Sequence, residues 1–271
     1  MLLESILMIR GGSFGEDFGQ KLILSLIGLA ICVYDWKVND KRKDYFWVFL
    51  VGTVIWSLAE LSLQFGGTRV LQKKYFFGIE VTRALWLTIP LQGMSEGAFV
   101  AVIGMLFADR FLNEETRKKW VGIFLIVFGI LLALALPNGI NYDSVPADDT
   151  SIPSRRDMFN MTSIFFIIFM CALAIGWLVT TTPEARKRGI AMYLVMATFI
   201  AWWTFTEWLT GQRWIEVGTL QSDGTYSNLR RAPAIIEFLA LAYDFMIEVS
   251  LIYVPFLAIP YWLGLIKKED N

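Results

Sequence analysis

Long, mostly apolar stretches recur along this chain of 271 residues and are separated by polar segments. A helix needs about 20 such residues to cross the hydrocarbon core of a bilayer. The stretches do not alternate polar and apolar residues, as the strands of a membrane β-barrel do. The pattern therefore predicts an all-α fold, a polytopic bundle of seven transmembrane helices over residues 18–36, 45–65, 84–111, 120–136, 159–181, 190–211 and 234–266.

Composition and charge indicate the environment and the orientation of this bundle. Hydrophobic residues make up 56% of the chain, which is typical of an integral membrane protein. The short segments 37–44, 110–119 and 186–188 are densely basic, and Lys267 and Lys268 follow the last stretch. Because cytoplasmic loops are enriched in Lys and Arg, we expect the N-terminus outside and the C-terminus inside, in the plasma membrane.

Two distant segments, residues 41–60 and 188–207, can be aligned without a gap. The alignment pairs, 147 positions apart, Trp56 with Trp203, Glu60 with Glu207 and, further on, Arg83 with Arg230. Parallel repeats of this kind occur in transporters, so we expect a single domain with a 3+1+3 arrangement. Its parts are a first repeat over about 18–111, a linking helix over about 120–136 and a second repeat over about 159–266. The alternative is a chance match between hydrophobic helices.

Acidic residues interrupt several of the apolar stretches. Glu237, Asp244 and Glu248 are seven and four residues apart, which places them on one stripe of a helix. Charge facing lipid is costly, so this stripe should face the bundle interior or a watery cavity. The helical rise of about 1.5 Å per residue brings acids of other helices to a similar depth. The predicted ion- or proton-handling layer comprises Glu60, Glu96, Glu207, Asp244, Glu248 and Glu237.

The chemistry expected of this layer depends on its partners. Carboxyls in a low dielectric take up protons, and a hard cation prefers oxygen ligands; which metal would bind is left open. The alternative is that the acids are protonated and hydrogen-bonded between helices as structural contacts. Basic partners are expected only from the outer rim, from Arg83, Arg213, Arg230 and Arg231.

Aromatic and basic residues near the acids are candidates for a pocket or gate. They are Arg83, Arg230, Trp56, Trp86, Trp203, Trp208 and Pro90. The alternative for the tryptophans is packing or an interfacial belt. The chain has no histidine, which excludes His-liganded zinc, Ser–His dyads and His-based proton relays.

Short motifs in four of the predicted helices resemble the microbial rhodopsins. In "TRALWLTIPLQG" the matching positions are Arg83, Trp86, Thr88, Pro90 and Leu91. "RKDYFWVFLVGTVIW" resembles the second helix of that family, and "EWLTG" resembles the end of its sixth. "DFMIEVS" has the Asp-x-x-x-Lys spacing of the seventh helix, with Glu248 in place of the retinal lysine.

This resemblance implies an opsin-like seven-helix protein that lacks the retinal lysine. It assigns to the pocket lining Arg83, Trp86, Pro90, Trp208 and Asp244. Leu85 stands at the counterion position, and the last helix offers no lysine. No Schiff-base retinal is therefore expected, and the cofactor is left open.

Three functions are compatible with these patterns. The first is transport, conduction or sensing of protons or a cation through the carboxylate layer. The second is a non-catalytic accessory or scaffolding subunit that binds partner proteins, lipid or a non-covalent pigment. The third is an intramembrane enzyme with carboxyls as acid and base, for which no nucleophile or metal set stands out. The expected partners are the lipid bilayer, other proteins or a second copy of the chain, and not nucleic acid.

Overall fold

The computed structural model describes residues 4–10, 17–38, 41–65, 69–71, 73–138, 154–221 and 226–266. Five of its helical segments are long and apolar enough to cross a membrane. They are α2 (Asp44–Phe65), the composite of α3 (Leu85–Gln92), η2 (Gly93–Phe99) and α4 (Val100–Leu112), α5 (Glu114–Ala135), α6 (Met161–Thr180) and α7 (Pro183–Leu209). The chain is thus mostly helical, as an integral membrane protein of the helical class is.

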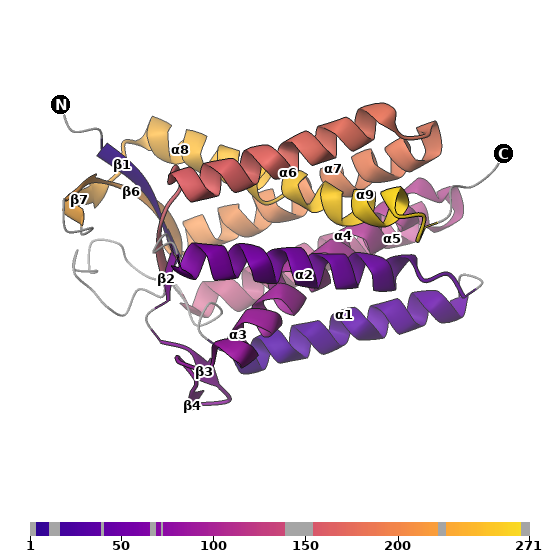
Figure 1. Cartoon of the computed structure of the whole chain (residues 1–271), viewed down its shortest axis with the longest axis horizontal. Helices are drawn as coiled ribbons and strands as arrows, with labels where there is room; N and C mark the ends of the chain where they lie inside the picture. Colours follow the sequence, from indigo (N-terminus) through magenta and orange to yellow (C-terminus); the bar gives the residue numbers. More distant parts are fainter. Residues whose placement is uncertain are drawn as a thin grey trace.

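Two further helical segments lie alongside these five (Figure 1). One is α1 (Phe18–Val38). The other is interrupted: α8 (Ala234–Tyr243), the π-helix η5 (Asp244–Glu248), the 3-10 turn η6 (Leu251–Tyr253) and α9 (Val254–Trp262). A short 3-10 turn, η3 (Leu136–Asn138), follows α5.

Each apolar stretch of the sequence contains helix, but two helices begin earlier than predicted. The predicted starts were residues 120 and 190, whereas α5 begins at Glu114 and α7 at Pro183. In α5 the side chain of Asn113 accepts a hydrogen bond from the backbone N–H of Glu115 at 2.9 Å. Polar capping residues of this kind add a first turn that hydrophobicity does not reveal.

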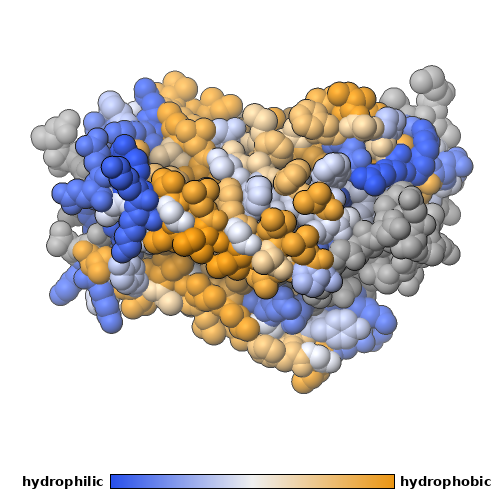
Figure 2. All heavy atoms as spheres, turned by 180° about the vertical axis from the view of Figure 1, so that it is seen from behind, coloured by the Kyte–Doolittle hydropathy of each residue, from blue (hydrophilic) through white to orange (hydrophobic). Residues whose placement is uncertain are grey.

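The outer surface of the helices is apolar between two polar ends. On the face shown in Figure 2, hydrophobic residues cover the middle of the molecule and hydrophilic residues lie toward both ends. Along α5, the exposed side chains include Leu125, Ile126, Ile130 and Leu134. Apolar side chains directed away from the protein interior suit contact with lipid acyl chains.

A five-stranded antiparallel sheet covers one end of the helices and departs from the predicted all-α fold. Its strand order is β2 (Arg69–Leu71), β5 (Ser154–Asp157), β1 (Glu4–Arg10), β6 (Arg213–Leu220) and β7 (Tyr226–Arg231). A separate two-stranded hairpin joins β3 (Tyr75–Phe76) to β4 (Ile79–Glu80). The strands are short and come from four distant parts of the chain, so no local pattern predicts their pairing.

The sheet defines what we call the sheet end of the molecule, and the opposite end is the basic end. At the sheet end, Met8 of β1 and Ile215 and Val217 of β6 pack with Ala240 and Leu241 of α8. Alternate residues point to opposite faces of a strand, so this face of the sheet rests on the helices. The connections α1–α2, α4–α5 and α6–α7 all lie at the basic end (Figure 1).

Glycines allow the π-helix η2 to lie directly against α2. A Cβ at Gly97 would be 2.5 Å from the carbonyl oxygen of Gly52, and one at Gly93 would be 2.4 Å from that of Thr53. Real Cβ atoms do not approach a carbonyl so closely, so only glycine fits. This contact fixes where the neighbouring residue Glu96 lies.

Candidate functional site

A cavity of about 380 Å³ lies between the helices and reaches the sheet. Met8 of β1 contributes to its wall at the sheet end, and Phe107 and Phe124 contribute to it deeper in the bundle. Most of its wall is aliphatic and aromatic. A volume of this size is in the range of small-molecule sites, about 300–1,000 Å³.

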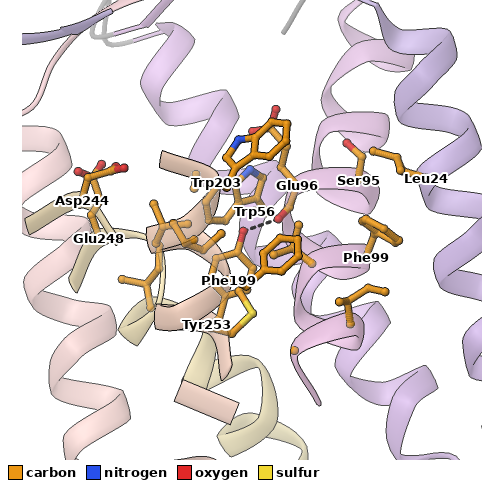
Figure 3. Close-up of a pocket in the computed structure, with 18 of the residues that line it drawn as sticks. Leu24, Trp56, Ser95, Glu96, Phe99, Phe199, Trp203, Asp244, Glu248 and Tyr253 are labelled. Atoms are coloured by element: carbon orange, nitrogen blue, oxygen red, sulfur yellow. Dashed lines mark hydrogen bonds between the residues drawn. The ribbon is translucent and has the colours of Figure 1, made fainter. Parts of the chain in front are cut away.

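Charged residues line the cavity toward the sheet end. They are Glu60 of α2, Glu96 of η2, Arg156 of β5, Arg213 of β6, and Asp244 and Glu248 of η5. Figure 3 shows Asp244 and Glu248 at one side of the cavity, Glu96 at the other, and Trp56 and Trp203 between them. The site therefore combines an apolar interior with a charged layer below the sheet, which we call the sheet-end charged layer.

Arg213 is the more enclosed of the two arginines in the sheet-end charged layer. Its Nε lies 2.6 Å from Oε2 of Glu207, and its Nη1 lies 2.6 Å from Oδ2 of Asp244. Nη1 also donates to Oγ1 of Thr204 at 3.1 Å. Only 4% of the Arg213 side chain is exposed. One guanidinium thus joins α7 to η5 through two charge-assisted contacts.

Arg156 extends the same ionic network across the cavity wall. Its Nη1 forms an ion pair with Oε1 of Glu248, and its Nη2 lies 3.8 Å from Oδ1 of Asp244. Burial lowers the pKa of Arg156, but Glu248, Asp244 and Tyr243 together outweigh burial and raise that pKa above its ordinary value. Arg156 therefore stays charged, and Asp244 lies between two guanidinium groups.

Glu96 is paired with a lysine at the opposite side. Nζ of Lys21, a residue of α1 that is fully buried, lies 2.7 Å from Oε1 of Glu96 and 2.6 Å from Oε1 of Gln92. Glu60 is also buried and accepts a hydrogen bond from Nε2 of Gln64 at 2.7 Å. The acids that share this layer are thus engaged by cations or amides.

Both π-helical segments carry acids of the cavity wall. Glu96 lies in η2 of the third long segment, and Asp244 and Glu248 lie in η5 of the last. The hydroxyl of Tyr253 donates to the backbone carbonyl of Glu96 and so links the two segments (Figure 3). π-helical turns are rare and concentrate at functional sites, which marks this layer rather than the rest of the bundle.

Two polar atoms in the cavity wall have no hydrogen-bond partner among the described residues. They are Oε2 of Glu248 and Oγ of Ser163, and both are buried. Glu248 uses only its other oxygen, for Arg156. Buried polar atoms are normally paired, so these two are positions where a bound group can contribute a hydrogen bond.

Of the six predicted ion- or proton-handling residues, five lie in or beside this layer and Glu237 does not. Glu237 instead accepts hydrogen bonds from Arg231 at 3.1 and 3.2 Å. Glu237 lies seven residues before Asp244 in the regular helix α8, about 10 Å along its axis. It is therefore paired outside the layer, and the π-helix that begins at Asp244 changes only the relation of Asp244 to Glu248.

The predicted pocket and gate residues divide in the same way. Trp56 and Trp203 line the cavity. Trp86 is 79% exposed, Trp208 is 40% exposed, and Arg83 and Pro90 are on the surface. Arg230 is exposed and pairs with Glu4 at 2.7 Å. The structure therefore brings Trp56 and Trp203 to the site and leaves the other five residues outside it.

The cations of the layer differ from those expected. Arg213 was among the four predicted rim arginines, but Lys21 and Arg156 were not. Lys21 lies near the end of an apolar stretch, where a lysine usually reaches toward water. Arg156 follows an acid-rich connection and reaches the cavity only because β5 joins the sheet. No sequence signal marks either as a partner of the acids.

The geometry of the acids does not match a metal centre. Within the part of the chain that the structure describes, no group of three or more His, Cys, Asp or Glu could hold a metal ion. Asp244 and Glu248 face arginines, and Glu96 faces a lysine. The arrangement suits hydrogen bonding and ion pairing more than cation coordination.

A second ionic cluster, which is partly buried, lies at the basic end, and we call it the basic-end cluster. Nε and Nη2 of Arg188 donate to Oδ1 and Oδ2 of Asp109, both at 2.8 Å. Nη1 of Arg188 donates to Oδ2 of Asp44 at 2.9 Å. The hydroxyl of Tyr45 donates to Asp109 at 3.0 Å. This cluster joins α2, α4 and α7.

Comparison with models of protein families, with curated proteins and with solved structures gave no match to this chain. The resemblance to microbial rhodopsins therefore stays a prediction. Of the positions that carry it, Arg83, Trp86 and Pro90 lie on the surface, whereas Glu248, at the lysine position, lies in the cavity wall.

Proposed function

We propose that the chain crosses the plasma membrane seven times and binds an apolar small molecule in the cavity between its helices. In this proposal α1 and the interrupted α8–α9 segment also cross the bilayer, with the sheet end outside and the basic end inside. The basic connections at one end support this orientation. The function is binding by a non-catalytic membrane protein, as a carrier, a sensor or an accessory subunit of a larger assembly.

The observation that carries the proposal is the cavity itself. It has about 380 Å³ of space, a mostly apolar wall and polar groups only toward the sheet. Sites for small molecules have this composition, with an apolar body and a few polar groups that fix orientation. A lipid or a non-covalent pigment fits that description, and a hydrated ion does not.

The proposal is tested by filling the cavity from one side. Val127 of α5 lines the cavity, whereas the neighbouring Ile126 is 64% exposed on the outer face. Protein purified in nanodiscs is extracted with solvent, and co-purified molecules are identified by mass spectrometry against empty nanodiscs. We expect a stoichiometric apolar molecule in the wild type and in I126W, and its loss in V127W. Identical extracts from all three would refute the proposal.

Proton handling is a second candidate, and one observation favours it. Glu207, Arg213, Asp244, Arg156 and Glu248 form a continuous ionic chain across the sheet-end charged layer. Protonation of one acid in such a chain changes the pairing of the others. In proteoliposomes with an imposed pH gradient, D244N and E248Q would then reduce proton flux. Flux equal to that of protein-free liposomes would exclude this function.

A further inference from the structure

The two unpartnered polar atoms in the cavity wall restrict the chemistry of what binds there. Glu248 is 4% exposed and Ser163 is 3% exposed, so water outside the protein does not satisfy them. They belong to elements that pack against one another, since α6 contacts η5. A ligand that completes this site must supply the hydrogen bonds that both atoms lack.

Glu248 requires a donor. Its Oε1 is held by Arg156, and a carboxylate in such an ion pair only accepts hydrogen bonds. Oε2 therefore needs an N–H or O–H group. Ser163 can donate its own proton, so it is best satisfied by an atom that accepts.

A hydroxyl group is the smallest group that meets both demands, because it donates one hydrogen bond and accepts others. An ammonium group only donates. It would therefore satisfy Glu248 but leave the proton of Ser163 without an acceptor.

The rest of the cavity wall determines the length and polarity of the remainder of the ligand. Trp203 and Val195 both line it from α7, eight residues and therefore about 12 Å apart along the helix. Phe199 lies between them in sequence and lines the same wall. A molecule with its polar end at Glu248 would thus have an apolar body running into the middle of the bundle.

We propose that the cavity binds an apolar molecule ending in a hydroxyl group, which donates to Oε2 of Glu248 and accepts from Oγ of Ser163. Long-chain alcohols, sterols and hydroxylated polyenes share this chemistry. The inference rests on the proposed function and narrows its ligand class.

The test compares three probes with the same ten-carbon chain: decanol, its methyl ether and decylamine. Binding to protein in nanodiscs is measured by native mass spectrometry at pH 7. The ether can accept from Ser163 but cannot donate to Glu248. We expect decanol to bind about tenfold more tightly than the ether, which corresponds to about 1.4 kcal/mol, and more tightly than the amine.

Variants assign the two contacts separately. E248Q is expected to weaken decanol toward the affinity of the ether while leaving the ether unchanged. S163A is expected to weaken decanol and the ether by a similar factor, and it keeps the test valid if E248Q does not fold. The matched control is S62A, which removes an exposed hydroxyl on α2 and should change neither.

The outcomes separate this inference from the proposed function. Equal affinity for decanol and the ether, or tighter binding of the amine, would overturn the hydroxyl assignment and leave the cavity proposal intact. No binding of any probe, together with identical extracts from wild type and V127W, would overturn the proposed function itself.

Discussion

Arginine–carboxylate clusters lie at both ends of the helices, but only the sheet-end charged layer contributes to the cavity wall. In the basic-end cluster both oxygens of Asp109 accept hydrogen bonds from Arg188, and Tyr45 adds a third. In the sheet-end charged layer one oxygen of Glu248 is bonded to Arg156, and the other has no partner among the described residues. The hydrogen bonds of Asp109 are therefore complete at the basic end, whereas Glu248 at the sheet end keeps one oxygen available for a further hydrogen bond.

Whether the hydrogen bonds of an ionic cluster are complete distinguishes a structural role from a binding role. The presence of buried charge alone does not distinguish them as clearly. A set of ion pairs whose hydrogen bonds are complete holds helices together and offers nothing to a ligand. A set of ion pairs whose hydrogen bonds are incomplete, and which lies beside a cavity, holds helices together and also offers a hydrogen-bonding position to a ligand. Charge within a membrane protein is commonly taken as a functional signal, and here the completeness of the hydrogen bonds distinguishes the two ends.

The largest expected effect is the loss of Arg213. In R213A, Glu207 and Asp244 would lose a shared partner in a site where 4% of the arginine side chain is exposed. Breaking a buried pair by removing one partner costs about 3–5 kcal/mol. We expect a large drop in the free energy of unfolding, measured by denaturant titration in detergent. The matched control R230A removes an exposed arginine paired with Glu4 and should leave stability unchanged.

The corresponding change at the basic end should have a smaller effect. In R188A the acids left behind are Asp44 and Asp109, whose side chains are 11% and 24% exposed and can be partly hydrated. We expect a loss between that of an exposed pair, about 0–1 kcal/mol, and that of a buried pair, about 3–5 kcal/mol. If R188A destabilises the protein as much as R213A, the contrast between the two ends is wrong.

The next effect concerns the π-helix that positions Glu96. In G97A the added methyl would lie 2.5 Å from the carbonyl oxygen of Gly52 and force η2 away from α2. Overpacking of this kind costs about 1–3 kcal/mol, and we expect reduced occupancy of the cavity as well. G129A is the control, since nothing lies within 4 Å of its new methyl. Helix propensity predicts a gain of about 0.4–1 kcal/mol for that variant, measured in the same unfolding assay.

The smallest effect is the sharpest test of hydrogen-bond completeness. Y45F removes a hydroxyl that donates to Asp109 and should cost about 0.5–1.5 kcal/mol. S163A removes a buried hydroxyl that has no partner in the described structure, so it should not lower the stability of ligand-free protein. Equal losses in the two variants, from unfolding curves of delipidated protein, would contradict the distinction drawn between the two ends.

Much of the helical framework could be predicted, because the apolar length needed to cross a bilayer is a strong local signal. The breaks within the helices could not. The π-helices η2 and η5 lie within long apolar stretches, and the geometry of η2 depends on contacts such as that of Gly97 with Gly52. Those contacts join residues from separate helices and leave no periodic trace.

The acids of the site were recognisable because charge within an apolar stretch is rare. Of their basic partners only Arg213 was expected, whereas Arg156 was not, because it reaches the layer from a strand whose pairing spans the chain. The internal repeat stays a prediction. Trp56 and Trp203 both line the cavity, but Lys41 is exposed whereas Arg188 is bound to Asp44 and Asp109.

The strand order of the sheet has a consequence for biogenesis. β1 precedes the other strands of the sheet in the chain, yet it pairs on one side with β5, which begins 144 residues after β1 ends, and on the other with β6. The sheet therefore cannot form around β1 until β6 has been synthesised. Asp244 and Glu248 follow both strands in the chain, so the arginines that they pair with are made before them.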